Sequence, residues 1–455
     1  MTKPASARIT EGVIWKQLLS FFFPIFLGTL FQQLYNTADT VIVGRAVGTQ
    51  ALAAVGSTSA FVNLINGFFI GLSTGATVLL SQFYGAEDRQ GVDDSLHTGM
   101  TLSLILGLMT VLVGVGSAPW MLKLTKIPEE CLTDALTYTR IYFSGALASM
   151  VYNMGAGILR AMGDSRRPMV FLIIACFSNI LLDLVLVVGL RMGVAGAALA
   201  TVLSQCLSAV LVIITLWKQH GLRLRKLSLK GELLARILRV GLPAGLQFIT
   251  FDISNVLIQS GINSFGATTI AGWTAYVKTD AIVWMISGAF GVSVTTFVGQ
   301  NFGAQKYDRI RRSVSTCMVM SVGTQLALST LLILLRYPIL GIYTTDPAVI
   351  RAGAYVMLWI VPFNAIFMPV EVFAGAMRGT GYSVMPTVIT CTSVCLFRVL
   401  WVAIPVALWH SVEMLALAYP LSWILSATVF YIAYRRGTWL HKRIRDCGMT
   451  PESNL

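Results

Sequence analysis

The sequence predicts an all-α membrane protein with twelve transmembrane helices in two six-helix lobes. Hydrophobic residues make up 56% of the 455 residues and charged residues only 12%, which lies well outside the usual range of soluble proteins. Long segments are apolar all round, a pattern that a helix tolerates in lipid or in a very large core. An internal repeat, described below, divides the chain into two similar halves.

Each of the twelve apolar segments is long enough to cross a hydrocarbon core of ~30 Å at a rise of ~1.5 Å per residue. Several are longer than a perpendicular crossing needs, which indicates tilt or extension beyond the bilayer. In chain order we expect helices over residues 17–43, 52–81, 95–118, 132–158, 168–190, 194–217, 238–262, 269–299, 314–335, 352–377, 385–408 and 413–434.

The repeat consists of two pairs of segments that share one offset. Residues 77–95 resemble residues 295–313, and residues 159–168 resemble residues 377–386, so that both pairs are 218 positions apart (295 − 77 = 377 − 159 = 218). Six crossings return the chain to the side on which it started, so the second half repeats the first in the same orientation. A membrane protein built from two parallel halves is typical of transporters.

The basic residues give the orientation and the lobe boundaries. Most of the 33 Lys and Arg residues fall at the N-terminus, in the loops after even-numbered helices and in the C-terminal tail. This positive-inside bias predicts a multi-pass protein of the cytoplasmic membrane with both termini in the cytoplasm. It explains the net charge of +13 better than nucleic-acid binding does. We place the N-terminal lobe at residues 1–218, a basic cytoplasmic linker at 219–236 and the C-terminal lobe at 237–455.

The sequence carries no pattern of an enzyme or of an ATP-driven pump. A Walker A motif is absent, the four histidines lie near helix ends or in loops, and the seven cysteines form no CxxC pair. We therefore expect no enzymatic activity, no cofactor and no disulfide or zinc framework. An ion gradient is then the expected energy source, and it requires ionisable groups inside the membrane.

Polar residues gather at similar depth in the outer half of the N-terminal lobe. Asn179 and Asp183 are four residues apart and share a helix face, while Asp39, Thr201 and Tyr138 lie at comparable distances from the outer ends of their own helices. A charge at the bilayer centre costs ~2.5–3.5 kcal/mol on insertion scales, so each ionisable residue is a functional candidate. Two carboxyl groups in one poorly solvated pocket cannot both ionise readily, which suits proton exchange.

The same oxygens also suit a hard cation. Asp39, Asn179, Asp183 and Thr201 offer the carboxylate, amide and hydroxyl ligands that Na⁺ prefers. The residues leave the choice between a proton and Na⁺ open, and a purely structural role in holding helices together is the alternative.

The C-terminal lobe has a different set of buried charges. Lys278 and Asp280 are two residues apart and so lie on different faces of one helix. We expect Arg398 to serve as a structural counter-ion. Asp252 and Glu371 are the remaining buried acids of this lobe.

Four motifs carry a resemblance that spans essentially the whole chain. They are FQQLYNTADTVIVGRAVGTQALAAVG at residues 31–56, SQFYGAEDR at 81–89, VGQNFGAQ at 298–305, and the paired LRAMGDSRRP and MRGTGYSVMP segments of the repeat. With them the chain resembles the multidrug and toxic compound extrusion (MATE) family in its bacterial branches. The resemblance implies a V-shaped pair of lobes and ion-coupled export of amphipathic, often cationic, organic compounds.

The resemblance also implies roles for particular residues. Asp39 matches the coupling aspartate of helix 1, and Pro24, fifteen residues earlier, matches a proline at which that helix is proposed to bend. Polar partners of the family match Asn179, Asp183 and Thr201, with Tyr138 and Asn153 on helix 4 as further candidates for ion coupling.

The C-terminal lobe departs from the family pattern. Where one branch has an aspartate on helix 10 this chain has Phe367, and the acid of that helix is Glu371, one turn later. The helix-7 acid, Asp252, is displaced by one residue. These departures favour the branches that rely on the N-terminal aspartates. The residues that we expect to line the substrate cavity are Asp252, Glu371, Tyr35 and Gln32.

The sequence fits two other classes of transporter less well. The major facilitator superfamily would require a GxxxDRxGRR-like run between helices 2 and 3, and the YGAEDRQGVDD loop does not supply it. A lipid-linked oligosaccharide flippase needs a cationic cavity for pyrophosphate, whereas buried acids outnumber buried bases here. We therefore expect a monomeric antiporter that binds cationic amphiphiles and contacts membrane lipids, with the flippase as the alternative.

The repeat is broken where the proposed chemistry lies. At the shared offset, Asn179 corresponds to Phe397, Asp183 to Trp401 and Thr201 to Tyr419, and Asp39 corresponds to Ile258 after a shift of one residue. The duplication thus predicts two similar lobes of which only the first keeps the ion site.

Overall fold

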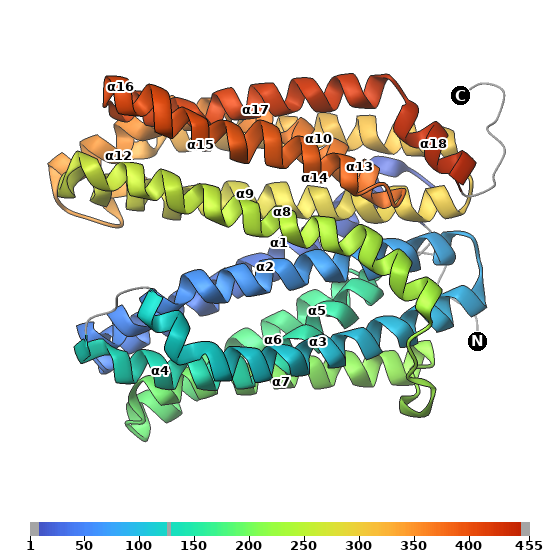
Figure 1. Cartoon of the computed structure of the whole chain (residues 1–455), viewed down its shortest axis with the longest axis horizontal. Helices are drawn as coiled ribbons and strands as arrows, with labels where there is room; N and C mark the ends of the chain where they lie inside the picture. The colour runs from blue at the N-terminus through green and yellow to red at the C-terminus, as the bar shows by residue number, and fades with distance from the viewer. Residues whose placement is uncertain (1–8, 125–128, 447–455) are drawn as a thin grey trace. The chain divides into compact units, whose positions relative to one another are not determined.

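Helices are the regular elements throughout the part of the chain that the structure describes, residues 9–124 and 129–446. The structure is a computed structural model, and its helices follow one another with short connections (Figure 1). Within those residues, eleven helical stretches are long and apolar enough to cross a membrane. The all-α membrane fold expected from the composition is therefore borne out.

The fourth expected span, residues 132–158, is divided into two helices. α4 (Glu129–Ser144) and α5 (Ala146–Ala161) are separated at Gly145. A Cβ atom at Gly145 would lie 2.6 Å from a methyl group of Val202, so the break allows the next helix of the bundle to approach closely. Each half is shorter than a spanning helix, which accounts for the difference between twelve expected spans and eleven.

The chain forms two compact units. Unit 1 comprises, among the described residues, 20–241, and unit 2 comprises 9–19 together with 242–446. The remaining helices of the first half are α1 (Ile14–Ala46), α2 (Thr49–Gly85), α3 (Arg89–Leu124), α6 (Arg166–Asp183), the π-helix η1 (Leu184–Gly189), α7 (Gly193–His220) and the 3₁₀ turn η2 (Leu224–Lys226).

The second half continues the same order with more interruptions. Its elements are α8 (Gly231–Ile262), η3 (Asn263–Phe265), α9 (Ala267–Gly303), α10 (Tyr307–Leu334), α11 (Arg336–Gly341), α12 (Pro347–Ile360), η4 (Val361–Phe363), α13 (Asn364–Gly379), α14 (Val384–Thr390), the π-helix η5 (Cys391–Leu396), α15 (Phe397–Trp401), the π-helix η6 (Val402–Val406), α16 (Ala407–Trp409), α17 (Val412–Arg435) and α18 (Thr438–Asp446). Ser411 caps α17, where its hydroxyl oxygen accepts from the Met414 N–H.

The first helix of each half runs from one unit into the other. α1 begins in unit 2 and enters unit 1 at Ser20, whereas α8 begins in unit 1 and leaves it after Gly241. A proline follows each crossing, Pro24 in α1 and Pro243 in α8. Because proline lacks an N–H, the backbone ladder is weakened just beyond both crossings.

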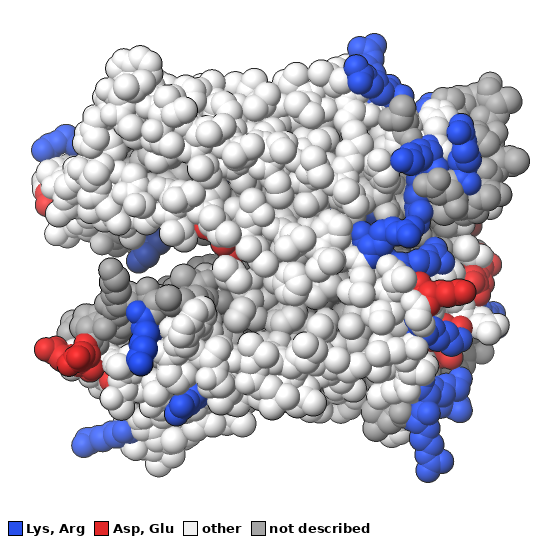
Figure 2. Space-filling view, viewed as in Figure 1, with Lys and Arg blue, Asp and Glu red and all other residues white. Residues whose placement is uncertain are grey.

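The surface of the helices suits lipid. On the face shown in Figure 2, Lys and Arg gather mainly at the ends of the helices, and the flanks are mostly free of charged side chains. Large apolar side chains are exposed along the helices, for example Leu112 and Val113 on α3 and Phe177 and Leu181 on α6. Exposed apolar surface of this extent is expected on a helix that faces hydrocarbon.

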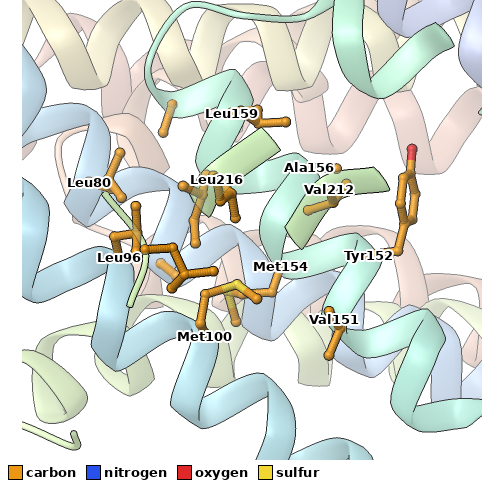
Figure 3. Close-up of a cluster of buried hydrophobic side chains, with 14 of the residues drawn as sticks. Leu80, Leu96, Met100, Val151, Tyr152, Met154, Ala156, Leu159, Val212 and Leu216 are labelled. Carbon is orange, nitrogen blue, oxygen red and sulfur yellow. The ribbon is translucent and has the colours of Figure 1, made fainter. Parts of the chain in front are cut away.

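The core of unit 1 is an apolar layer between α2, α3, α5 and α7. Figure 3 shows Leu80, Met100, Met154 and Leu216 converging in this layer from the four helices. Tyr152, at its edge, donates a hydrogen bond from its hydroxyl to the Pro168 carbonyl (3.1 Å). The layer fixes α5 and α7 and so positions the polar residues of the neighbouring helices.

A crossing of two glycines brings α2 and α8 into backbone contact within unit 1. A Cβ atom at Gly75 would lie 2.8 Å from the Gly241 nitrogen and still closer to the Ile237 carbonyl oxygen, and a Cβ at Gly241 would lie 2.7 Å from the Leu72 carbonyl oxygen. Small residues allow helices to approach in this way in membranes, where packing replaces the hydrophobic effect.

We predict that Gly75→Ala destabilises the protein by about 1–3 kcal/mol, because backbone atoms have to move to make room for the methyl group. The melting temperature of the purified protein in detergent measures this effect. Gly116→Ala is the matched control, since its Cβ would meet no atom within 4 Å in another helical position. Equal melting temperatures of the two variants would contradict the prediction.

Candidate ion-coupling site

The polar residues expected to form an ion site are buried together in unit 1. Asp39 on α1 is 6% exposed, Asn179 and Asp183 on α6 are both 0% exposed, and Thr201 on α7 is 5% exposed. Asp39 and Asp183 are close enough to interact electrostatically. Both carboxyl groups also interact electrostatically with the hydroxyl of Tyr138 on α4. Asp39, Asp183 and Tyr138 thus form one polar cluster to which α1, α6 and α4 contribute, and Thr201 is buried on α7.

A change in helix type positions Asp183. α6 ends at Asp183, and the following six residues, Leu184–Gly189, form a π-helix. π-helical turns widen the backbone and occur frequently at functional sites. Asn179 lies four residues before Asp183 in the α-helical part, so both side chains lie on one face, as the spacing predicted.

The cluster has unused hydrogen-bonding capacity. One carboxyl oxygen of Asp39, both carboxyl oxygens of Asp183 and both amide atoms of Asn179 are buried without a hydrogen-bond partner. A buried polar atom left unpaired costs about 1–3 kcal/mol in proteins. Four of these five atoms are oxygens, so the cluster is suited to binding a proton or a hard cation.

A layer of tyrosines and amides surrounds the cluster. The Tyr35 hydroxyl is hydrogen-bonded to Gln32 and Gln205, and the Tyr142 hydroxyl is hydrogen-bonded to Gln205 and accepts from the Asn66 amide (3.0 Å). The Tyr142 ring also stacks on Tyr138, with centroids 6.0 Å apart.

Tyr142, Gln205 and Asn66 were not among the site residues expected from the sequence. Two of them could have been found from spacing, because Tyr142 follows Tyr138 by four residues and Gln205 follows Thr201 by four. Asn66, on α2, had no such neighbour.

For Asn153 and Pro24, the structure shows local surroundings and does not test the expected roles. The Asn153 amide donates a hydrogen bond to the Ser149 carbonyl within α5 (3.0 Å). Pro24 lies inside α1, which continues unbroken past it to Ala46. The roles assigned to both residues stay predictions.

The acids of unit 2 are arranged differently from those of unit 1. Glu371 pairs with Arg378 at 3.5 Å, and Arg378 in turn donates to the Gln247 amide oxygen on α8 (3.4 Å). Asp252 is half-buried. Asp280 is buried and Lys278 is exposed, in agreement with their expected positions on different faces of one helix.

The acids and histidines do not form a metal centre of the usual kind. Within the described residues, no group of three or more His, Cys, Asp or Glu side chains could hold a metal ion. The Na⁺ site expected from the sequence at Asp39, Asn179, Asp183 and Thr201 stays a prediction.

A profile of the MatE family matches the chain twice, over residues 24–185 and 243–404. The chain belongs to the MatE family. The two matches follow the internal repeat and cover most of the chain. Membership of this family confirms the prediction that the chain is a MATE transporter and that it is not an enzyme.

Two bacterial proteins are similar to this chain along almost their entire length. Proteins named "Probable multidrug resistance protein YoeA" and "Probable multidrug resistance protein YpnP", both from Bacillus subtilis strain 168, are 26% and 28% identical to this chain. These matches cover 95% and 94% of this chain and 95% and 97% of the relatives.

The MatE fold is also shown by a solved structure, described as the outward-facing conformation of a multidrug resistance MATE family transporter of the MOP superfamily. It superimposes with a TM-score of 0.90 at 22% sequence identity and covers 97% of this chain and 100% of that chain.

We predict that Tyr142→Phe lowers the free energy of unfolding by about 1–3 kcal/mol, because the Asn66 amide loses the hydroxyl to which it donates and Gln205 keeps only its bond with Tyr35. The melting temperature in detergent reports this loss. Tyr337→Phe is the control, because Tyr337 is half exposed and its ring is held by Arg336 rather than through its hydroxyl. A Tyr142→Phe protein as stable as the control variant would show that the tyrosine–amide layer contributes nothing.

Proposed function

We propose that this MatE transporter is an antiporter that exports amphipathic, cationic organic compounds across the cytoplasmic membrane in exchange for a proton or Na⁺. The observation that carries the proposal is the group of unpartnered buried oxygens on Asp39, Asp183 and Asn179. The names of the relatives, which refer to multidrug resistance, support the substrate class. Both termini lie in the cytoplasm in this proposal.

The exchange follows from competition for the same negative charge. When the two carboxyl groups are ionised, they attract a cationic compound, and aromatic faces such as that of Tyr35 add cation–π attraction. Binding of a proton or Na⁺ at Asp39 and Asp183 cancels that attraction and releases the compound outside. Return to the inward-open state then discharges the ion into the cytoplasm.

We predict that Asp39→Asn lowers gradient-driven transport roughly tenfold or more, because the variant carries no titratable group at the proposed coupling position. Purified protein in liposomes that contain a fluorescent cationic dye is given a pH gradient and, separately, a Na⁺ gradient. The gradient that moves the dye identifies the coupling ion.

Asp308→Asn is the matched control, because Asp308 is an exposed acid in the first turn of α10 and its substitution leaves transport unchanged. Transport by Asp39→Asn at the full rate would refute the assignment of Asp39. Dye movement that neither gradient drives in the wild-type protein would refute the antiport itself.

We also propose that Pro24 is the hinge at which α1 bends during exchange. Proline removes the hydrogen bond to the carbonyl of residue 20, which is the residue at which α1 enters unit 1. The weakest part of the helix therefore coincides with its passage between units.

Pro24→Ala is expected to slow transport several-fold, while equilibrium binding of the dye stays measurable, because the restored hydrogen bond stiffens α1. Pro119→Ala, which changes another proline inside a helix, is the control. Equal turnover by Pro24→Ala and the wild-type protein would reject the hinge.

A further inference from the structure

Unit 2 contains a buried cation that the proposed exchange does not use. Arg398 is 1% exposed and lies on α15, a five-residue helical segment between the π-helices η5 and η6. It falls within one residue of the position that corresponds to Asn179 in the repeat (180 + 218 = 398). The stretch that contains Asn179 in the first half thus contains a guanidinium in the second half, one residue further along the helix.

The guanidinium is only partly satisfied by its neighbours. Its Nε donates to the Ser422 hydroxyl (3.1 Å), and its plane lies over the Tyr419 ring at 4.1 Å and near the Trp423 ring at 6.0 Å. Its two terminal nitrogens, Nη1 and Nη2, are buried without a hydrogen-bond partner. An unpaired charge in such a place is costly, because burial removes its hydration.

The neighbouring acid does not neutralise Arg398. Asp280 accepts from the Trp284 indole (2.8 Å), from the Asn364 amide (3.1 Å) and from the Tyr276 hydroxyl. Among the described residues, no carboxylate lies within ion-pair distance of Arg398, so the counter-ion role expected from sequence has no partner there.

The unpartnered atoms on Arg398 and on the rings that lie against it are donors. Besides Nη1 and Nη2, the indole Nε1 of Trp423 is buried without a partner, and indole nitrogen can only donate. In unit 1 the unused atoms are mostly acceptors. The polar cluster of unit 1 therefore offers mainly acceptors, whereas the group formed by Arg398 and Trp423 offers donors.

We propose that unit 2 holds a binding site for the carboxylate of an aromatic organic acid. The terminal nitrogens of Arg398 form a planar fork that matches the two oxygens of a carboxylate. Tyr419 and Trp423, whose ring centroids are 5.7 Å apart, supply aromatic faces beside the fork, and Trp273 packs on Tyr419 at 6.0 Å. This site is independent of the cation exchange at Asp39.

Benzoate is the probe, and its binding to the purified wild-type protein is followed by the fluorescence of the nearby tryptophans or by equilibrium dialysis. We expect saturable binding that Arg398→Gln weakens roughly tenfold or more, equal to about 1.4 kcal/mol. Benzamide, which has the same ring without the charge, does not bind. Asp280→Asn tightens benzoate binding, because it removes a negative charge near the site.

Arg436→Gln is the matched control, since Arg436 is exposed at the end of α17 and its loss leaves benzoate affinity unchanged. Arg398→Lys keeps a buried cation and loses the fork, so it tests the geometry if Arg398→Gln fails to fold. No saturable benzoate binding, or equal binding by the wild-type protein and Arg398→Lys, overturns the proposal. Displacement of benzoate by equimolar chloride would assign the site to halide ions and also overturn it.

Discussion

The whole structure depends on one constraint, that each backbone N–H and C=O inside a bilayer has to be bonded within the protein. Long helices meet this constraint, and so the places where the helical ladder changes are few and informative. They include Pro24 and Pro243, where the first helices of the two halves pass between units, and the π-helices η1, η5 and η6. Asp183 directly precedes η1, and Arg398 lies between η5 and η6. The irregular backbone and the buried charges therefore occur together in both halves.

Duplication gave the two halves a similar framework and left the polar residues free to diverge. Unit 1 concentrates oxygens on Asp39, Asn179 and Asp183, whereas unit 2 concentrates nitrogens on Arg398 and Trp423. An apolar surrounding strengthens both kinds of electrostatic preference, because low dielectric surroundings screen charges weakly.

Most of the fold could be predicted from the sequence, because length and apolar character alone identify a spanning helix. The repeat, and the common helix face of Asn179 and Asp183, could likewise be predicted from residue spacing alone. Hydrogen bonds between helices could not be predicted, since the pairing of Tyr142 with Asn66 depends on how α4 packs against α2. The surroundings of Arg398 were missed for the same reason, as a buried arginine in a sequence does not reveal whether an acid or an aromatic ring faces it.

The exchange of helix beginnings between the units has a consequence for synthesis of the chain. Unit 1 includes residues up to Gly241, and the glycine crossing with Gly75 belongs to its packing. Unit 1 therefore cannot complete its packing until the start of α8 has left the ribosome, and residues 9–19 have to wait for the second half before they find their own unit. A chain cut between α7 and α8 would produce two fragments that each lack a segment of their own unit. Association of the fragments, rather than independent folding, would then restore both units.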